Sequence, residues 1–290
     1  MTFPMTVKRR IEYIDITKGI AILVVCVGHI LQNCQTDRYI YSFHMPLFFL
    51  LSGITFKVRL NENFITFFWR KFRSLMIPYY CFGFVAICVY YVMGCYAERT
   101  LNKTFGFGFC EMCCDLFYGT GGNDRLKFYV ALWFLSCLFS IECISYFILS
   151  FKQSSDGKTR FPFKIIDFLF LFIAIGVVEF STDSPFADSL PMGLNAAFRY
   201  LPFFLCGYLL QNRSLTDGNR QISDIVKSVL LILIGILCFF FCEHMRSRSL
   251  NFIAVLLYYP TAFISSFGYL FFCRFVKHDK FLSRRGRESL

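Results

Sequence analysis

Long apolar runs alternate with short polar links along the whole chain. An α-helix needs about 20 predominantly apolar residues to cross the hydrocarbon core of a bilayer. Eight runs approach that length, and they predict helices over residues 17–33, 39–56, 75–95, 128–151, 165–180, 196–212, 225–242 and 251–273. The pattern therefore predicts an all-α fold, a polytopic transmembrane helix bundle in a single integral-membrane domain over residues 1–290.

The links between these runs carry most of the charge. Basic residues are in excess near the N-terminus, in the links after the second, fourth and sixth runs, and in the tail over residues 274–290. Cytoplasmic loops of membrane proteins are enriched in Lys and Arg, so this alternation predicts that both termini and the basic tail are cytoplasmic. Residues 57–73 are expected to form a basic link and residues 96–127 a polar loop.

Composition supports a membrane protein. Hydrophobic residues make up 56% of the chain and charged residues only 17%, whereas a soluble domain has about 25% charged residues. The net charge of +11 could indicate a nucleic-acid partner, but the charges cluster in the links, so none is expected. Most of the 14 cysteines lie in apolar runs, where a free cysteine behaves as a small buried hydrophobic residue. Cys110-x-x-Cys113 has no second ligand pair nearby, so no metal site is predicted.

Two polar residues of the first run share one helix face. Lys18 and His29 are eleven residues apart, which is about 20° past three full turns and roughly 16 Å along the axis. Asp15 lies about one turn before Lys18. A histidine inside a membrane helix can act as a general acid or base near neutral pH. The alternative to a catalytic role is that His29 only forms a hydrogen bond to a neighbouring helix and so helps the helices to pack.

The second run carries His44 close to Pro46, and Ser52 near its other end. A short link makes the first two runs antiparallel, so His29 and His44 are expected to face each other at similar depth. Glu142 lies in the middle of the fourth run and requires a polar partner or a protonated state.

Arginines precede the third run as Arg70-x-x-Arg73. Paired guanidinium groups can bind phosphates. The alternative role of these two arginines is to set the topology of the third helix.

Several separated motifs together resemble the acyltransferase-3 family of bacterial integral-membrane O-acyltransferases. They occur in the order of the family and extend over nearly the whole chain. The motifs are YIDITKG at 13–19 with GH at 28–29, FHMPLFF at 43–49 with SG at 52–53, RKFR at 70–73 with IPY at 77–79, LWFL at 132–135, and LPFF at 201–204 with GY at 207–208.

The resemblance implies an acyltransferase that transfers groups other than aminoacyl groups, in the bacterial inner (cytoplasmic) membrane. The donor would be acyl-CoA, mainly acetyl-CoA, and the acceptor a hydroxyl of a cell-surface polysaccharide or lipid-linked glycan. No bound cofactor is expected. The resemblance and the residue chemistry together single out catalytic His29 and His44, acyl-donor-binding Lys18, Arg70 and Arg73, and supporting Asp15 and Ser52.

Within that scheme His29 acts as the general base or takes the acyl group itself. His44 and Ser52 are both candidates to stabilise the oxyanion. The chain departs from the family pattern at Lys18, where the family has an arginine. The family also continues beyond the tail with one or two further helices, so the chain is expected to be truncated.

Two other functions remain open on the sequence. The first is a transporter or flippase for a glycan or a small anion, with His29 and Glu142 relaying protons. The second is an inactive, truncated member of the family.

Overall fold

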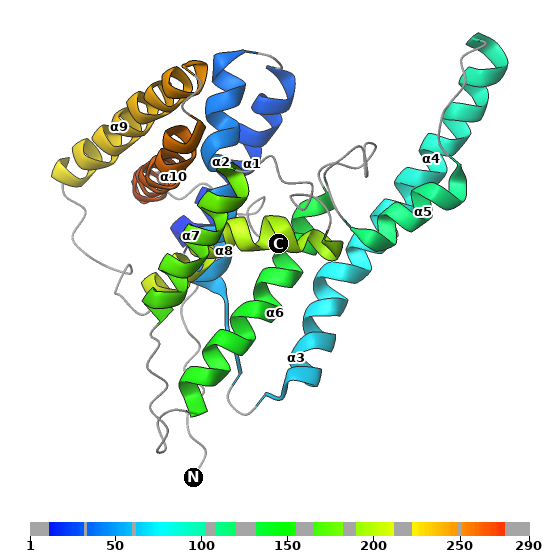
Figure 1. Ribbon diagram of the computed structural model, residues 1–290, viewed down its shortest axis with the longest axis horizontal. Helices are drawn as coiled ribbons and strands as arrows, with labels where there is room; N and C mark the ends of the chain where they lie inside the picture. The colour runs from blue at the N-terminus through cyan, green and yellow to red at the C-terminus, as the bar shows by residue number, and fades with distance from the viewer. Residues whose placement is uncertain are drawn as a thin grey trace. The chain divides into compact units, whose positions relative to one another are not determined.

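The computed structural model describes residues 12–31, 34–59, 62–101, 108–119, 132–154, 165–181, 190–211, 222–248 and 251–275. Nearly all of these residues are in helices, and none of them is in a strand (Figure 1). The helices are α1 (Glu12–Ile30), α2 (Gln35–Thr55), α3 (Phe64–Lys71), the π-helical η1 (Phe72–Met76), α4 (Ile77–Leu101), α5 (Phe109–Tyr118), α6 (Trp133–Ser154), α7 (Ile165–Ser181), the 3-10 turn η4 (Pro191–Gly193), α8 (Leu194–Gln211), α9 (Ile222–Ser247) and α10 (Asn251–Cys273). The all-α prediction is confirmed.

Each of the eight predicted runs coincides with a helix: α1, α2, α4, α6, α7, α8, α9 or α10. Two predicted links were wrong in part, because α3 lies in the basic link over 57–73 and α5 lies in the polar loop over 96–127. The tail beyond residue 275 lies outside the described residues.

The basic link becomes helical because it has both a cap and an apolar face. Asn63 caps α3, with its side-chain oxygen accepting the Thr66 N–H at 2.9 Å. Phe64 and Phe67 then pack against Tyr146 of α6, with ring centroids 5.6 and 4.7 Å away. Packing of this face stabilises a short helix that ends in two charged residues, Arg70 and Lys71.

The helix continues from α3 through η1 into α4, so the predicted start of the third run at residue 75 is wrong. Pro78 therefore lies inside a continuous helix rather than in its first turn. Proline lacks an N–H and its ring clashes with the carbonyl four residues earlier. The π-helical turn ends just before it, where the Ile77 N–H donates to the Phe72 carbonyl five residues back. This widened turn accommodates the proline.

The chain divides into two compact units, residues 1–56 with 206–290 and residues 57–205. In the first unit α9 and α10 run side by side (Figure 1). Gly235 lets α9 approach Ser265 of α10 closely, because a side chain there would meet Ser265. Small residues commonly allow such close packing between membrane helices. Helix α2 packs on α10, where the ring of Phe43 stacks on that of Tyr269 at 4.5 Å.

The end of α8 also belongs to the first unit and closes the C-terminal end of α2. Gln211 Nε2 donates to the carbonyl oxygens of Ile54 and Phe56 at 3.1 and 2.9 Å. One turn earlier, Gly207 lies directly against the Leu50 carbonyl, with no room for a side chain. The glycine therefore sets the distance between α8 and α2.

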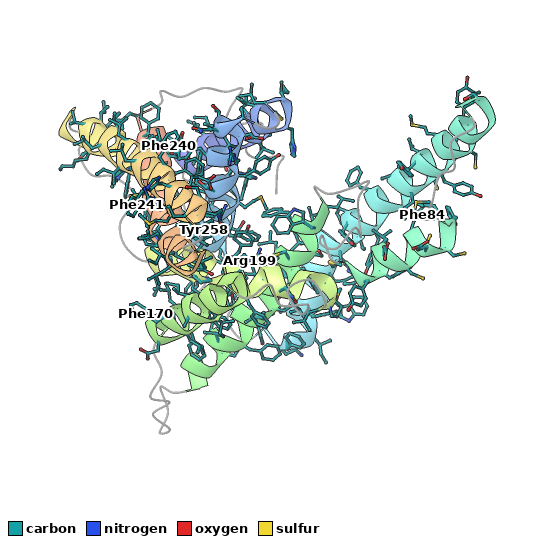
Figure 2. All side chains as sticks on the ribbon, turned by 45° about the horizontal axis from the view of Figure 1, so that its top comes forward. Phe84, Phe170, Arg199, Phe240, Phe241 and Tyr258 are labelled. Carbon is teal, nitrogen blue, oxygen red and sulfur yellow. The ribbon has the colours of Figure 1, made fainter. Side chains whose placement is uncertain are left out.

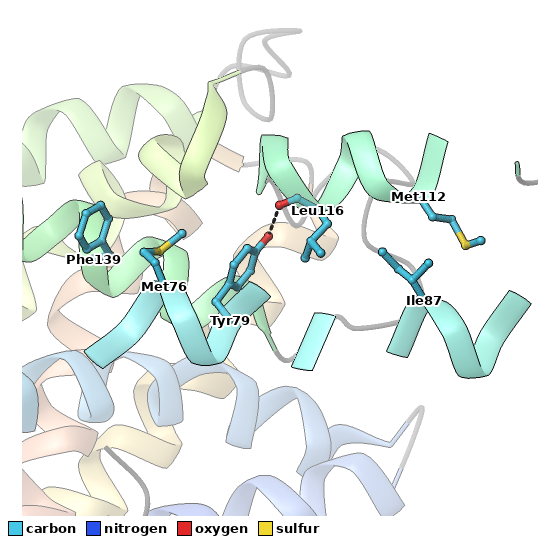
Figure 3. Close-up of a cluster of buried hydrophobic side chains, with 6 residues drawn as sticks. All are labelled: Met76, Tyr79, Ile87, Met112, Leu116 and Phe139. Atoms are coloured by element: carbon cyan, nitrogen blue, oxygen red, sulfur yellow. Dashed lines mark hydrogen bonds between the residues drawn. The ribbon is translucent and has the colours of Figure 1, made fainter. Parts of the chain in front are cut away.

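The second unit contains a buried cluster that joins η1, α4, α5 and α6 (Figure 3). Its members are Met76, Tyr79, Ile87, Met112, Leu116 and Phe139. The Tyr79 hydroxyl donates to the Leu116 carbonyl at 2.8 Å, so the buried phenol has a partner. This cluster fixes the start of α4 against α5 and α6.

Five helical stretches among the described residues are long and apolar enough to cross a membrane: Tyr13–Ile30, Phe64–Tyr96, Trp133–Ser150, Asp224–Ser247 and Ile253–Cys273. Large aromatic side chains project outward from several helices, among them Phe84, Phe170, Phe240 and Phe241 (Figure 2). Exposed apolar surface on this scale is unfavourable in water and favourable in lipid. The protein is therefore a helical membrane protein.

We expect Gly207→Ala to destabilise the first unit. The new methyl group would meet the Leu50 carbonyl and lie 3.0 Å from the Ile54 nitrogen, and both are backbone atoms with little freedom to move. Overpacking of this kind costs about 1–3 kcal/mol. The thermal unfolding midpoint in detergent should fall. Gly108→Ala is the matched control, since nothing lies within 4 Å of its added carbon; equal midpoints for the two variants would contradict the prediction.

Candidate active site

His29, near the end of α1, is hydrogen-bonded to Tyr41 of α2. The His29 Nδ1 and Tyr41 Oη atoms are 2.9 Å apart, and the two rings meet nearly perpendicularly with centroids 5.9 Å apart. The rest of the His29 side chain is exposed at the surface of the first unit. One nitrogen of this imidazole is therefore fixed and the other is accessible.

His44 follows Tyr41 by one helical turn and contacts the same phenol ring, with centroids 5.1 Å apart. Its side chain is buried. The His44 Nδ1 atom lies 2.8 Å from the Ile40 carbonyl oxygen. A carbonyl oxygen can only accept, so Nδ1 carries the proton and neutral His44 presents a lone pair on Nε2. The structure thus brings His29 and His44 together around Tyr41, and these three residues form the histidine end of the site.

The other predicted residues of the first unit lie far from the histidine end. Asp15 and Lys18 are buried in the first half of α1, and Lys18 is roughly 16 Å from His29 along the axis. Helices α1 and α2 are antiparallel and meet at the His29–Tyr41 contact. Lys18 lies eleven residues before His29, and Ser52 lies eleven residues after Tyr41. Both are therefore about the same distance from that contact along the helix axes. Asp15, Lys18 and Ser52 form the lysine end.

Ser52 is engaged within its own helix. Its hydroxyl donates to the Phe48 carbonyl at 2.9 Å, and it lies eight residues, roughly 12 Å, beyond His44 along α2. The two residues that were candidates for stabilising the oxyanion therefore lie at opposite ends of the site.

The surface near the histidine end carries a small ionic network. Arg38, one turn before Tyr41 on α2, donates to Glu243 of α9 at 2.9 Å. Glu243 also accepts from Arg246 at 3.2 Å. Two arginines therefore share one carboxylate.

Arg70 of the second unit is bound to Glu62. The guanidinium Nε and Nη2 atoms each donate to one carboxylate oxygen at 2.8 Å, and only 3% of the Glu62 side chain is exposed. This bidentate bond lowers the pKa of the Glu62 carboxyl. Arg73 lies in η1 and is exposed. Of the predicted arginine pair, Arg70 is already engaged with a carboxylate and Arg73 is accessible.

Lys71 forms an ion pair with Glu142 of α6 at 2.6 Å. The two side chains are 15% and 7% exposed, so the pair is largely buried. The prediction that Glu142 requires a polar partner is confirmed. The pair joins α3 to α6 close to the Phe64 and Phe67 contacts described above.

Sequence reasoning missed Tyr41, Glu62 and Lys71. A usable signal existed for Tyr41, because it precedes His44 by three residues and therefore lies on the same helix face. Lys71 and Glu142 are 71 residues apart in the sequence, and only the packing of α3 against α6 brings them together.

The cysteine motif lies on α5, where Cys110 is exposed and Cys113 is partly buried. Within the described ranges no group of three or more His, Cys, Asp or Glu side chains could hold a metal ion.

Comparison with known proteins gives one match. A family model described as an acyltransferase domain matches residues 11–286, nearly the whole chain. Neither the curated proteins nor the solved structures contain a match.

We expect Lys71→Met to lower the free energy of unfolding by about 3 kcal/mol, because it leaves the buried Glu142 carboxylate without its cation. The double variant Lys71→Met/Glu142→Leu should recover most of that loss, since an apolar pair of similar size removes the uncompensated charge. Chemical or thermal unfolding in detergent measures both.

Lys227→Met is the matched control for this experiment. Lys227 pairs with Asp224 at 3.4 Å, but its side chain is 71% exposed, so little change in stability is expected. A single Lys71→Met variant as stable as Lys227→Met would show that the buried pair does not support the fold.

Proposed function

The chain belongs to the acyltransferase-3 family, and from this premise we propose that it is a membrane-bound O-acyltransferase. The proposed reaction moves an acyl group, in the first instance acetyl, from acyl-CoA to a hydroxyl of a cell-surface polysaccharide or lipid-linked glycan. The proposed location is the bacterial inner membrane. The observation that carries the proposal is the histidine end, where the imidazoles of His29 and His44 are each anchored through Nδ1 beside the Tyr41 ring.

In the proposed mechanism His29 Nε2 accepts the proton of the acceptor hydroxyl as that oxygen attacks the thioester carbonyl. The new C–O bond forms, the C–S bond breaks, and the proton passes from the imidazolium to the departing thiolate of CoA. If His29 takes the acyl group first, a C–N bond to the imidazole forms as the C–S bond breaks. The acceptor oxygen then attacks the acyl-imidazole, so that the C–O bond forms, the C–N bond breaks, and the hydroxyl proton passes to the CoA thiolate.

The tautomer of His44 makes its Nε2 atom a hydrogen-bond acceptor, so it does not suit the role of a hydrogen-bond donor to the oxyanion. Neutral His44 has its proton on Nδ1, bound to the Ile40 carbonyl, so Nε2 can accept a hydrogen bond but cannot donate one. We propose that His44 Nε2 orients the acceptor hydroxyl beside His29. The Ser52 hydroxyl, bound to Phe48 within α2, supports no role in this step.

We propose Lys18 in the first unit, and separately Arg70 and Arg73 in the second unit, as cations that can bind a phosphate of the acyl donor. Lysine offers a point charge and arginine a planar fork of donors. Arg73 is exposed and can meet a phosphate directly, whereas Arg70 must exchange the Glu62 carboxylate for it. Asp15, near Lys18 on α1, supports this lysine.

Glu142 gives no support to the rival function of a proton-coupled transporter. Its carboxylate is held by Lys71 at 2.6 Å, and such a buried ion pair accounts for the presence of an acid in this helix. We therefore propose the enzyme rather than the transporter.

His29→Ala is expected to abolish acylation of surface glycan, with a loss of at least about 100-fold, because a general base contributes about 10²–10⁴ to the rate. Mass spectrometry of the glycan measures the acyl mass difference, and immunoblotting of membranes confirms that the variant is expressed. His244→Ala is the control, since His244 is an exposed residue of α9 bound to Arg248. Full acylation by His29→Ala would refute the assignment.

Arg73→Ala is expected to raise the KM for acetyl-CoA about tenfold and leave kcat nearly unchanged, because a charge-assisted hydrogen bond to phosphate contributes about 1.5–3 kcal/mol. Initial rates in isolated membranes at varied acetyl-CoA give both constants. Arg59→Ala removes an exposed arginine of the same unit and should leave KM unchanged. Equal KM values for the two variants would remove Arg73 from the donor site.

A further inference from the structure

The bond between Tyr41 and His29 can run in either direction. A phenol can donate to Nδ1 or accept from it, and the 2.9 Å separation of the two atoms suits both. If Tyr41 donates, the single imidazole proton lies on Nε2, which then cannot take a proton from an acceptor hydroxyl. If Tyr41 accepts, the proton lies on Nδ1 and Nε2 is the base. The direction of this bond therefore decides whether His29 can act.

Asp37 is a charged neighbour of the Tyr41 hydroxyl and bears on that direction. It lies four residues before Tyr41 on α2, so the two side chains share one side of the helix. Asp37 is buried, and its charge interacts electrostatically with the Tyr41 hydroxyl. A nearby carboxylate favours the orientation in which the hydroxyl proton points toward it, and in that orientation the phenol oxygen can accept from His29 Nδ1.

The tautomer of His44 matches the one that His29 would have if His29 Nδ1 donates to Tyr41. The Ile40 carbonyl holds the proton of His44 on Nδ1. Tyr41, when it accepts, holds the proton of His29 on the corresponding nitrogen. Both imidazoles then present Nε2 as the unanchored atom, and the phenol ring between them contacts both rings edge-on.

We propose that Tyr41 is a positioning residue, which together with Asp37 holds His29 in the Nδ1–H tautomer and leaves Nε2 as the base. The catalytic consequence rests on the function proposed above for His29, whereas the tautomer itself is a property of the resting protein. Tyr41 contributes no proton to the reaction. Its part is to fix which nitrogen of His29 meets the acceptor.

Nitrogen NMR of the full chain in lipid bilayers tests the tautomer directly. The chain has only four histidines, so ¹⁵N-histidine labelling gives few signals and His29→Ala identifies those of His29. At about pH 8.5 a free imidazole is neutral. We expect a protonated Nδ1 and an unprotonated Nε2 at His29 in the wild-type protein. A proton on Nε2 would overturn the proposal.

Tyr41→Phe should convert this single tautomer into a mixture, because the ring and its packing remain while the hydroxyl is lost. Asp37→Asn should shift the populations in the same direction, because the carboxylate charge that orients the hydroxyl is lost. Tyr39→Phe is the matched control: it removes a hydroxyl two residues away that faces Ser265 of α10, and the His29 signals should not change. Unchanged His29 signals in Tyr41→Phe would overturn the proposal. If Tyr41→Phe does not fold, the wild-type spectrum and the Asp37→Asn spectrum test the proposal instead.

Acetyl transfer in isolated membranes gives the second readout. In Tyr41→Phe we expect kcat to fall about tenfold, which is a part of the roughly 10²–10⁴-fold that a positioned base contributes, with the KM for acetyl-CoA unchanged. Tyr39→Phe should retain both constants. A wild-type kcat in Tyr41→Phe would overturn the positioning role. Full activity of His29→Ala would instead refute the role of His29 as the base. The tautomer measured by NMR would not be affected by that result.

Discussion

Lipid provides no water to a polar side chain, so polar groups inside membrane helices must find their partners within the protein. The histidine of α2 bonds its Nδ1 to a carbonyl of the preceding turn. Ser52 likewise donates to its own helix, and the acid of α6 is neutralised by Lys71 of α3. Helix packing and polar pairing therefore depend on each other throughout this protein.

The same constraint shapes the candidate chemistry. An imidazole that donates from Nδ1 to a fixed acceptor is held in one orientation and one tautomer, and its Nε2 atom is left for proton transfer. His44 acquires this state from its backbone. His29 lies near the end of α1, and its Nδ1 is bonded to a side chain of the neighbouring helix, Tyr41, which we propose serves the same purpose. The contact between α1 and α2 is thus both a packing contact and part of the proposed site.

The two ends of the α1–α2 pair suit different parts of acyl transfer. The lysine end offers buried charge, which favours binding of an anion, and the histidine end offers titratable nitrogens, which favour proton transfer. Lys18 and His29 are separated by roughly 16 Å along one helix face, so they can serve two parts of one extended donor. In the second unit a carboxylate already fills the fork of Arg70, and a phosphate would have to displace it.

The sequence by itself determined the eight long apolar helices, though not α5, because run length and hydropathy are local properties, and it placed Lys18 and His29 on one face of α1. It missed α3, whose apolar face is short and becomes clear only where Phe64 and Phe67 meet α6. It named both histidines of the site but not Tyr41, which connects them. Only the tertiary structure could decide that Glu142 pairs with Lys71 and His29 with Tyr41, because both bonds join different helices and depend on how those helices pack.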